Sequence, residues 1–183
     1  MAEIQRKFQE LILYLAELSE ADPRFGKTKL NKLLFYIDFR AYEAFGRSVS
    51  GEAYQKLSYG PAPVRLLPAV EPLLLAGSAA WAERDYYGKP LQKLVALRSP
   101  DLKLFGPEEI DLIQRVVREL WELNGSEVSD LSHRFPGWQA AAEREVIPYA
   151  TVFIDEPRPL TEDEIAWAHQ EYEAFRAELQ GSR

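Results

Sequence analysis

The sequence predicts a mainly helical α+β domain with a small antiparallel sheet. Apolar residues recur at helical spacing along most of the chain, whereas only a few short segments alternate as a strand does. The 183 residues fit one domain that is long enough to bury a core. Hydrophobic residues make up 46% and charged residues 28% of the chain, which is typical of a globular protein. We therefore expect residues 1–183 to form a single domain.

Two helices are predicted near the N-terminus. The first covers 3–19 and ends before Pro23, because a proline disfavours helix in the residue that precedes it. The second covers 27–45 and stops at Gly46, a frequent C-cap residue. Its apolar stripe consists of Leu30, Leu33, Leu34, Ile37 and Ala41. The opposite side of this helix is expected to carry Lys29, Lys32 and Arg40.

The small sheet is predicted in the middle of the chain. Residues 53–57 alternate as a short strand does, and the following Tyr-Gly-Pro-Ala-Pro at 59–63 predicts a turn. Two more strands, 80–87 and 91–97, flank the Gly-Lys-Pro at 88–90, and this arrangement predicts a β-hairpin.

Further helices and one irregular segment complete the prediction. Helices are expected over 64–76, 107–123, 126–134, 137–144 and 161–180, and an extended or irregular segment over 147–155. Pro68 and Pro72 must break or kink the first of these helices unless they lie in its first turn. Asn124 and Gly125 are expected to close the second. The last helix opens with a Thr161–Glu164 capping box, and its simplest role is to pack on the core.

The charge of the chain argues against general nucleic-acid binding. The net charge is −7, and contacts to phosphate need lysine and arginine. The distribution is uneven, with six bases against two acids in 24–47 and eight acids against two bases in 155–180. The simplest interpretation is two solvated faces. The alternative is that the acidic end meets a basic partner.

The sequence lacks the usual signatures of several classes of protein. The chain has no cysteine, so it offers neither a disulfide nor a thiolate metal site. No apolar run approaches the roughly 20 residues that cross a bilayer, and the N-terminus lacks the order of a signal peptide. We therefore expect a cytoplasmic protein without a membrane partner, a metal or a cofactor.

The search for catalytic residues gives one weak candidate. Ser132 and His133 are neighbours, but adjacent residues point in different directions on a helix, so they make a poor nucleophile–base pair. The acids at 162–164 lie in a helical first turn, where the helix dipole explains them. The sequence also lacks a phosphate-binding glycine loop. These observations predict a binding protein rather than an enzyme, with a hydrolase as the remaining alternative.

In their order along the chain, several motifs resemble a known family. The quoted segments are 29–36 (Lys-Leu-Asn-Lys-Leu-Leu-Phe-Tyr), 45–47, 50–54, 59–63, 126–133, Trp138 and 147–149. They are similar to the Panacea domain, also called the SocA-like antitoxin domain, over about 27–156, with the helices at 3–19 and 161–180 outside the match. Tyr42 stands where members often carry histidine, and Arg134 where they often carry an acid.

The resemblance implies an antitoxin that binds and inhibits a cognate toxin, and one member of the family is similar to a protease adaptor. Members of this kind are associated with phages and mobile elements. The motif residues expected to serve the fold or an interaction are Lys29, Leu33, Tyr59, Gly60, Pro61, Ser132, His133 and Trp138. Independently of the resemblance, the acidic last helix offers a possible surface for the toxin at Glu164, Glu171, Tyr172 and Phe175.

A DNA-binding regulator is the main alternative. Helix 27–45, segment 62–76 and hairpin 80–97 follow one another in the order of a winged helix, so operator DNA is a possible second partner. The candidate recognition segment argues against it, because 62–76 contains only one base, Arg65, and two interrupting prolines. The sequence leaves the oligomeric state open.

Overall fold

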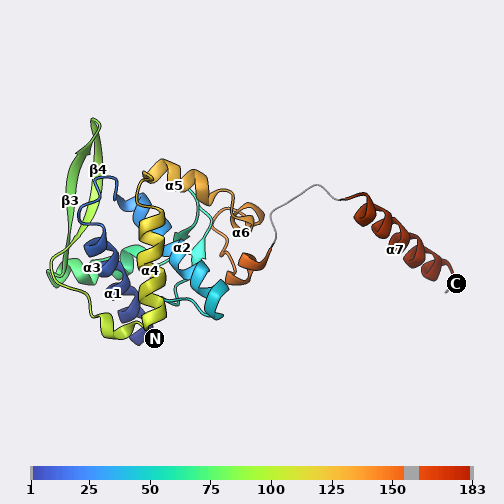
Figure 1. The fold of residues 1–183 in the computed structure, drawn as a ribbon, viewed down its shortest axis with the longest axis horizontal. Helices are drawn as coiled ribbons and strands as arrows, with labels where there is room; N and C mark the ends of the chain where they lie inside the picture. The colour runs from blue at the N-terminus through green and yellow to red at the C-terminus, as the bar shows by residue number, and fades with distance from the viewer. Residues whose placement is uncertain (1, 155–160, 182–183) are drawn as a thin grey trace.

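The computed structural model describes residues 2–154 and 161–181 as a mainly helical protein with two small antiparallel sheets (Figure 1). The α-helices are α1 (Ala2–Leu18), α2 (Lys27–Phe45), α3 (Leu66–Leu75), α4 (Pro107–Glu119), α5 (Gly125–Ser132), α6 (Pro136–Ala140) and α7 (Glu162–Gly181). Two short 3₁₀ helices are η1 (Leu102–Leu104) and η2 (Tyr149–Phe153). The strands are β1 (Tyr54–Gln55), β2 (Ala62–Pro63), β3 (Ala79–Tyr86) and β4 (Lys89–Ala96). The predicted fold class is confirmed.

Helix α2 lies at the centre of the core. It contacts α1, α4, α5, η2 and the strands β2 and β4, so most of its surface is covered by other elements. The predicted stripe is buried as expected, with Leu30, Leu34, Ile37 and Ala41 inaccessible to solvent. Gly46 caps the helix with a positive φ of 70°, a conformation that glycine adopts without a Cβ penalty.

The two sheets have separate places in the fold. Strand β1 pairs with β2 across the predicted turn, with Tyr54 opposite Pro63. Strands β3 and β4 form the predicted hairpin, with Ala79 opposite Ala96. Its turn is Tyr87–Gly88 rather than 88–90, because both residues have the positive φ that a two-residue hairpin turn needs. Figure 1 shows the hairpin extending beyond the helices.

Three local expectations are wrong. Helix α3 does not break at Pro72, which lies inside it, while Pro68 sits in its first turn. The neighbouring Leu73 is buried, and burial of apolar side chains favours the helix although Pro72 cannot donate a hydrogen bond. Asn124 does not close α4 but opens α5, since its side chain accepts from the backbone N–H groups of Ser126 and Glu127. Part of the segment expected to be extended or irregular forms the 3₁₀ helix η2.

The positions predicted for two lysines on α2 are also wrong. Lys29 and Lys32 were expected opposite the apolar stripe, yet they are only 1% and 2% exposed. Both amines reach partners supplied by other segments, and this permits their burial. The charge run at 24–47 consequently forms no basic face: Arg24 pairs with Glu122 at 2.8 Å, and Arg47 with Glu108 at 3.2 Å.

Helix α7 does not pack on the core in the way expected. Its capping box is present, because the Thr161 hydroxyl accepts from Glu164 N–H and the Glu164 carboxylate accepts from Thr161 N–H. However, Ile165, Trp167 and Tyr172 are 44%, 64% and 60% exposed. Figure 1 draws α7 clear of the other helices. No helix in the described part of the chain is long and apolar enough to cross a membrane.

Candidate functional site

The family motif comes together around the side chain of Lys32. Its amine is buried between α2 and the turn at 59–61, and it donates a hydrogen bond of 2.8 Å to the carbonyl of Pro61. Among the described residues no carboxylate pairs with it. Burial without a counter-charge lowers the pKa of Lys32 from 10.5 to about 7. The motif therefore places a weakly basic amine inside the fold.

Gly60 makes the contact between the turn and Lys32 possible. Its φ is +92°, and a Cβ at this position would lie 2.3 Å from Ser132 Oγ and 2.6 Å from Lys32 Nζ. Ser132 is fully buried in α5, and its hydroxyl donates to the Ser129 carbonyl at 2.7 Å. Gly60 thus lets α2, the turn and α5 meet at one point.

Trp138 contacts both His133 and Lys56 beside this point. The rings of His133 and Trp138 are stacked, with their centroids 4.3 Å apart, and the amine of Lys56 lies 4.4 Å from the Trp138 ring in a cation–π contact. Trp138 Nε1 donates to the Leu57 carbonyl at 3.2 Å. His133 and Trp138 therefore tie α5 and α6 to the turn, which supports the structural interpretation of both residues.

The other motif residues have separate places. Lys29 forms a buried ion pair with Asp22 at 2.6 Å and donates to the Trp121 carbonyl at 2.7 Å; burial lowers its pKa, which the hydrogen bond to Asp22 partly opposes. Leu33 is in the core. Tyr59 does not fold back on its own turn, since its side chain is 77% exposed.

A second buried polar cluster was missed by the sequence analysis. Asp38 in α2 is inaccessible to solvent and accepts hydrogen bonds from the Ser50 N–H at 2.8 Å, the Ser50 hydroxyl and the Tyr54 hydroxyl at 2.7 Å. Burial raises the pKa of Asp38, and these hydrogen bonds oppose the rise. Nearby, the Tyr149 hydroxyl donates to the Glu52 carbonyl. This cluster fixes the loop after α2 and joins it to η2.

These arrangements provide no catalytic constellation among the described residues. The Ser132 hydroxyl points to a backbone carbonyl, and His133 stacks on Trp138 rather than reaching a nucleophile. The His133 Nε2 atom and the Ser129 hydroxyl are buried without a hydrogen-bond partner in the described structure. No group of three histidines or carboxylates that could hold a metal occurs in the described ranges.

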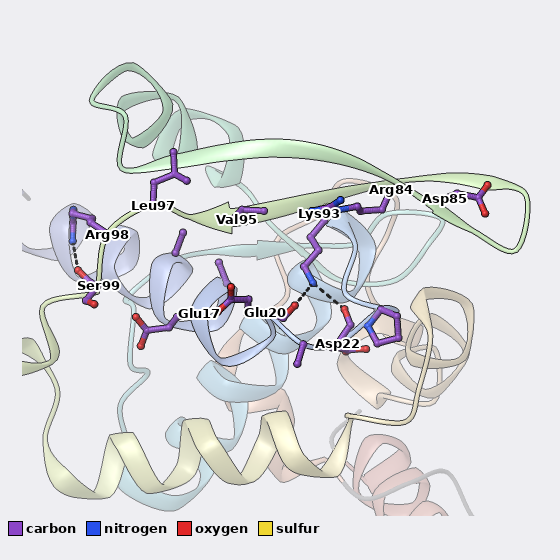
Figure 2. A pocket seen from close by; sticks show the side chains of 14 residues that line it. Glu17, Glu20, Asp22, Arg84, Asp85, Lys93, Val95, Leu97, Arg98 and Ser99 are labelled. Carbon is purple, nitrogen blue, oxygen red and sulfur yellow. Dashed lines mark hydrogen bonds between the residues drawn. The ribbon is translucent and has the colours of Figure 1, made fainter.

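A groove lies away from the motif, between the hairpin and the end of α1 (Figure 2). It has a volume of about 640 Å³ and contains charges of both signs, including Glu17, Glu20 and Arg84. Lys93 reaches from β4 to the end of α1 and donates to the carbonyls of Glu20 at 2.7 Å and Asp22 at 3.0 Å. Its amine thereby binds backbone carbonyls of the loop that follows α1 and is engaged within the fold.

The order helix, helix, hairpin does not create a DNA-reading surface. Helix α3 occupies the place of the recognition helix, but its only charged residue is Glu71, and its exposed positions include Leu67 and Leu75. Reading base edges requires polar and basic side chains on that helix.

The fold and the site define a helical domain whose characteristic residues hold turns and helices together. A family model, "Antitoxin SocA-like, Panacea domain", matches residues 30–139, somewhat less than the 27–156 expected. The chain therefore belongs to the SocA-like antitoxin family, the Panacea domain. Neither a curated protein nor a solved structure matches it.

Replacing Gly60 with alanine tests the close approach at the motif. Gly77 is the matched control, since its φ is +62° but a Cβ there would meet nothing within 4 Å. Gly77→Ala should lower the free energy of unfolding by about 1–2 kcal/mol through backbone strain alone. Gly60→Ala should cost roughly 1–3 kcal/mol more, because it also crowds Lys32 and Ser132. Urea unfolding measures both, and equal losses would contradict the packing described.

The pKa of Lys32 predicts a pH-dependent stability. The folded chain releases this proton near pH 7, whereas the unfolded chain keeps it up to about 10.5, so the folded state binds fewer protons between these values. The free energy of unfolding should therefore rise with pH from 7 towards 10, by about 1.4 kcal/mol per pH unit from this group. Lys32→Met should remove that part of the slope. The lysines at 29 and 93 remain in both proteins, so urea unfolding of the two at each pH isolates Lys32; parallel slopes would contradict the assignment.

Proposed function

We propose that this protein is the antitoxin of a toxin–antitoxin pair and neutralises its cognate toxin by direct protein–protein contact. Membership of the SocA-like family is the observation that carries the proposal. The use of the motif inside the fold supports it, because Lys32, Ser132 and His133 are engaged in packing and backbone contacts. In this proposal the protein is not an enzyme and acts in the cytoplasm.

The contact surface in this proposal is the acidic side of α7. Asp163, Trp167 and Glu171 follow one another at intervals of four residues, so they share one side of the helix. Trp167 is 64% exposed, and a large aromatic side chain with neighbouring acids suits a basic protein surface. Glu164 lies seven residues before Glu171 and extends the same acidic border.

Two further residues predicted for this surface are Tyr172 and Phe175. Tyr172 is 60% exposed but lies on the other side of α7 from Trp167, because five residues rotate the helix by about 500°, or 140° net. The Phe175 side chain lies outside the described residues. Transfer of the bound toxin to a protease remains a further prediction from the family resemblance, and no contact in the described structure bears on it.

Co-expression with the product of the adjacent reading frame tests the proposal. The full chain should co-purify with that protein and restore growth when it is toxic. Trp167→Ala should weaken the complex by roughly tenfold or more, as loss of a central aromatic anchor does. Gln170→Ala is the matched control, since this exposed residue lies on α7 outside the Asp163–Trp167–Glu171 line.

The outcomes separate function from surface. Absence of both binding and rescue by the full chain would overturn the antitoxin proposal. Binding that survives in a chain ending at Ile154 would leave the antitoxin function standing but move the contact away from α7. The truncated chain is a fair test because the described α7 side chains are largely exposed, so its melting temperature should match that of the full chain.

A further inference from the structure

A second surface of α7 is unaccounted for by the toxin contact. Ile165, Ala168 and Tyr172 are spaced by three and four residues, which places them in one stripe along the helix. All three are exposed, and the sequence continues the same spacing through 175 and 179. An apolar stripe repeating every seven residues is the pattern of a helix that pairs with another helix. Trp167 lies outside this stripe.

The charges beside the stripe indicate which helix it pairs with. In the seven-residue repeat, Ile165 and Tyr172 take position a and Ala168 takes position d. Glu171 then falls at position g on one flank, and Arg176 at position e on the other. Arg176 is exposed, and among the described residues its ion pair is a distant i,i+3 contact of 3.9 Å with Glu173. The stripe therefore has an acidic border and a border that includes a base.

The acidic border of one α7 helix is complementary to the base-containing border of a second α7 helix when the two run parallel. When two such helices run parallel, position g of each helix faces position e of the other, five residues further along. Glu171 of each copy then meets Arg176 of the second copy, so the pair forms twice. In an antiparallel arrangement the g positions face each other, and the acidic borders would repel.

We propose that α7 pairs with α7 of a second copy of this chain as a parallel two-stranded coiled coil. A second copy satisfies both borders of the stripe at once, whereas a uniformly basic partner would meet Arg176 with a like charge. The stripe spans only about two repeats, so the dimer is reversible and depends on protein concentration. Asp163 and Trp167 face outwards from the pair, whereas Glu171 belongs both to the pair and to the proposed toxin contact. The inference does not rest on that contact.

Sedimentation velocity of the purified full chain, without toxin, tests the pairing. The wild-type chain should shift from monomer to dimer as concentration rises. Glu171→Lys places a positive charge against Arg176 of the second copy, and Arg176→Glu places two acids together, so each change alone should weaken the dimer by roughly tenfold. Glu173→Lys is the control for the first change, because it makes the same charge reversal at an outward position and should leave the dimer intact.

Mixing the two charge variants gives the sharpest result. Each variant on its own brings like charges together at both contacts of a parallel dimer. In a one-to-one mixture, the mixed dimer instead places the new lysine against the new glutamate at one contact and keeps the native Glu171 and Arg176 at the other. The mixture should therefore dimerise more strongly than either variant alone. A wild-type chain that stays monomeric, or a mixture no better than its components, would overturn the proposal. A Glu171→Lys chain that dimerises more strongly than wild type would overturn the parallel orientation.

Discussion

The amine of Lys32 ends inside the protein, where its described hydrogen-bond acceptor is the carbonyl of Pro61. A buried amine that loses its only acceptor costs far more than the bond itself gains, so the turn at 59–61 is held firmly against α2. Gly60 allows the backbone to come close enough, and Ser132 closes the point from α5. Because α2 also contacts α1, α4 and η2, this junction fixes the arrangement of most of the described helices.

Periodicity predicted the elements well, because spacing records which face of a helix or strand is apolar. Periodicity predicted α2 and the strands of the hairpin within a few residues. The three-residue spacing of Thr161 and Glu164 predicted the capping box of α7. Periodicity could not place Lys29 and Lys32, since their burial depends on Asp22 and on a carbonyl 29 residues away. One signal was available for the missed cluster: Asp38 occupies a position between Leu34 and Ala41 on the apolar side of α2.

The candidate site, like the fold, was predicted only in part from the sequence. The motif residues were recognised by their resemblance to a family, and the structure brings Gly60, Ser132 and Lys32 together at one point. Lys29 joins the N-terminal loop to the end of α4 instead, while Tyr59 is left exposed. Residue chemistry alone could not show this convergence, because each residue has an ordinary local explanation. The partner surface on α7 stays a prediction, since a surface for an unseen partner leaves only indirect marks in a sequence.

The described structure consists of a body of tightly joined helices and sheets up to residue 154 and an exposed final helix, α7. The family motif serves the body, where buried polar groups specify how the helices meet. Trp167, Glu171 and Tyr172 of α7 are exposed and lie outside that network. Of the motif residues, Tyr59 is exposed and His133 and Trp138 are half-buried, whereas Lys29, Leu33, Gly60, Pro61 and Ser132 are buried.

Ser132 and His133 of the motif are engaged in contacts that hold the fold together. The most direct test measures melting temperature and toxin neutralisation together in Ser132→Ala and His133→Ala chains. Both changes should lower the melting temperature, and neutralisation should persist wherever the variant remains folded. Loss of neutralisation at an unchanged melting temperature would contradict a structural role and would assign these residues a direct part in binding or chemistry.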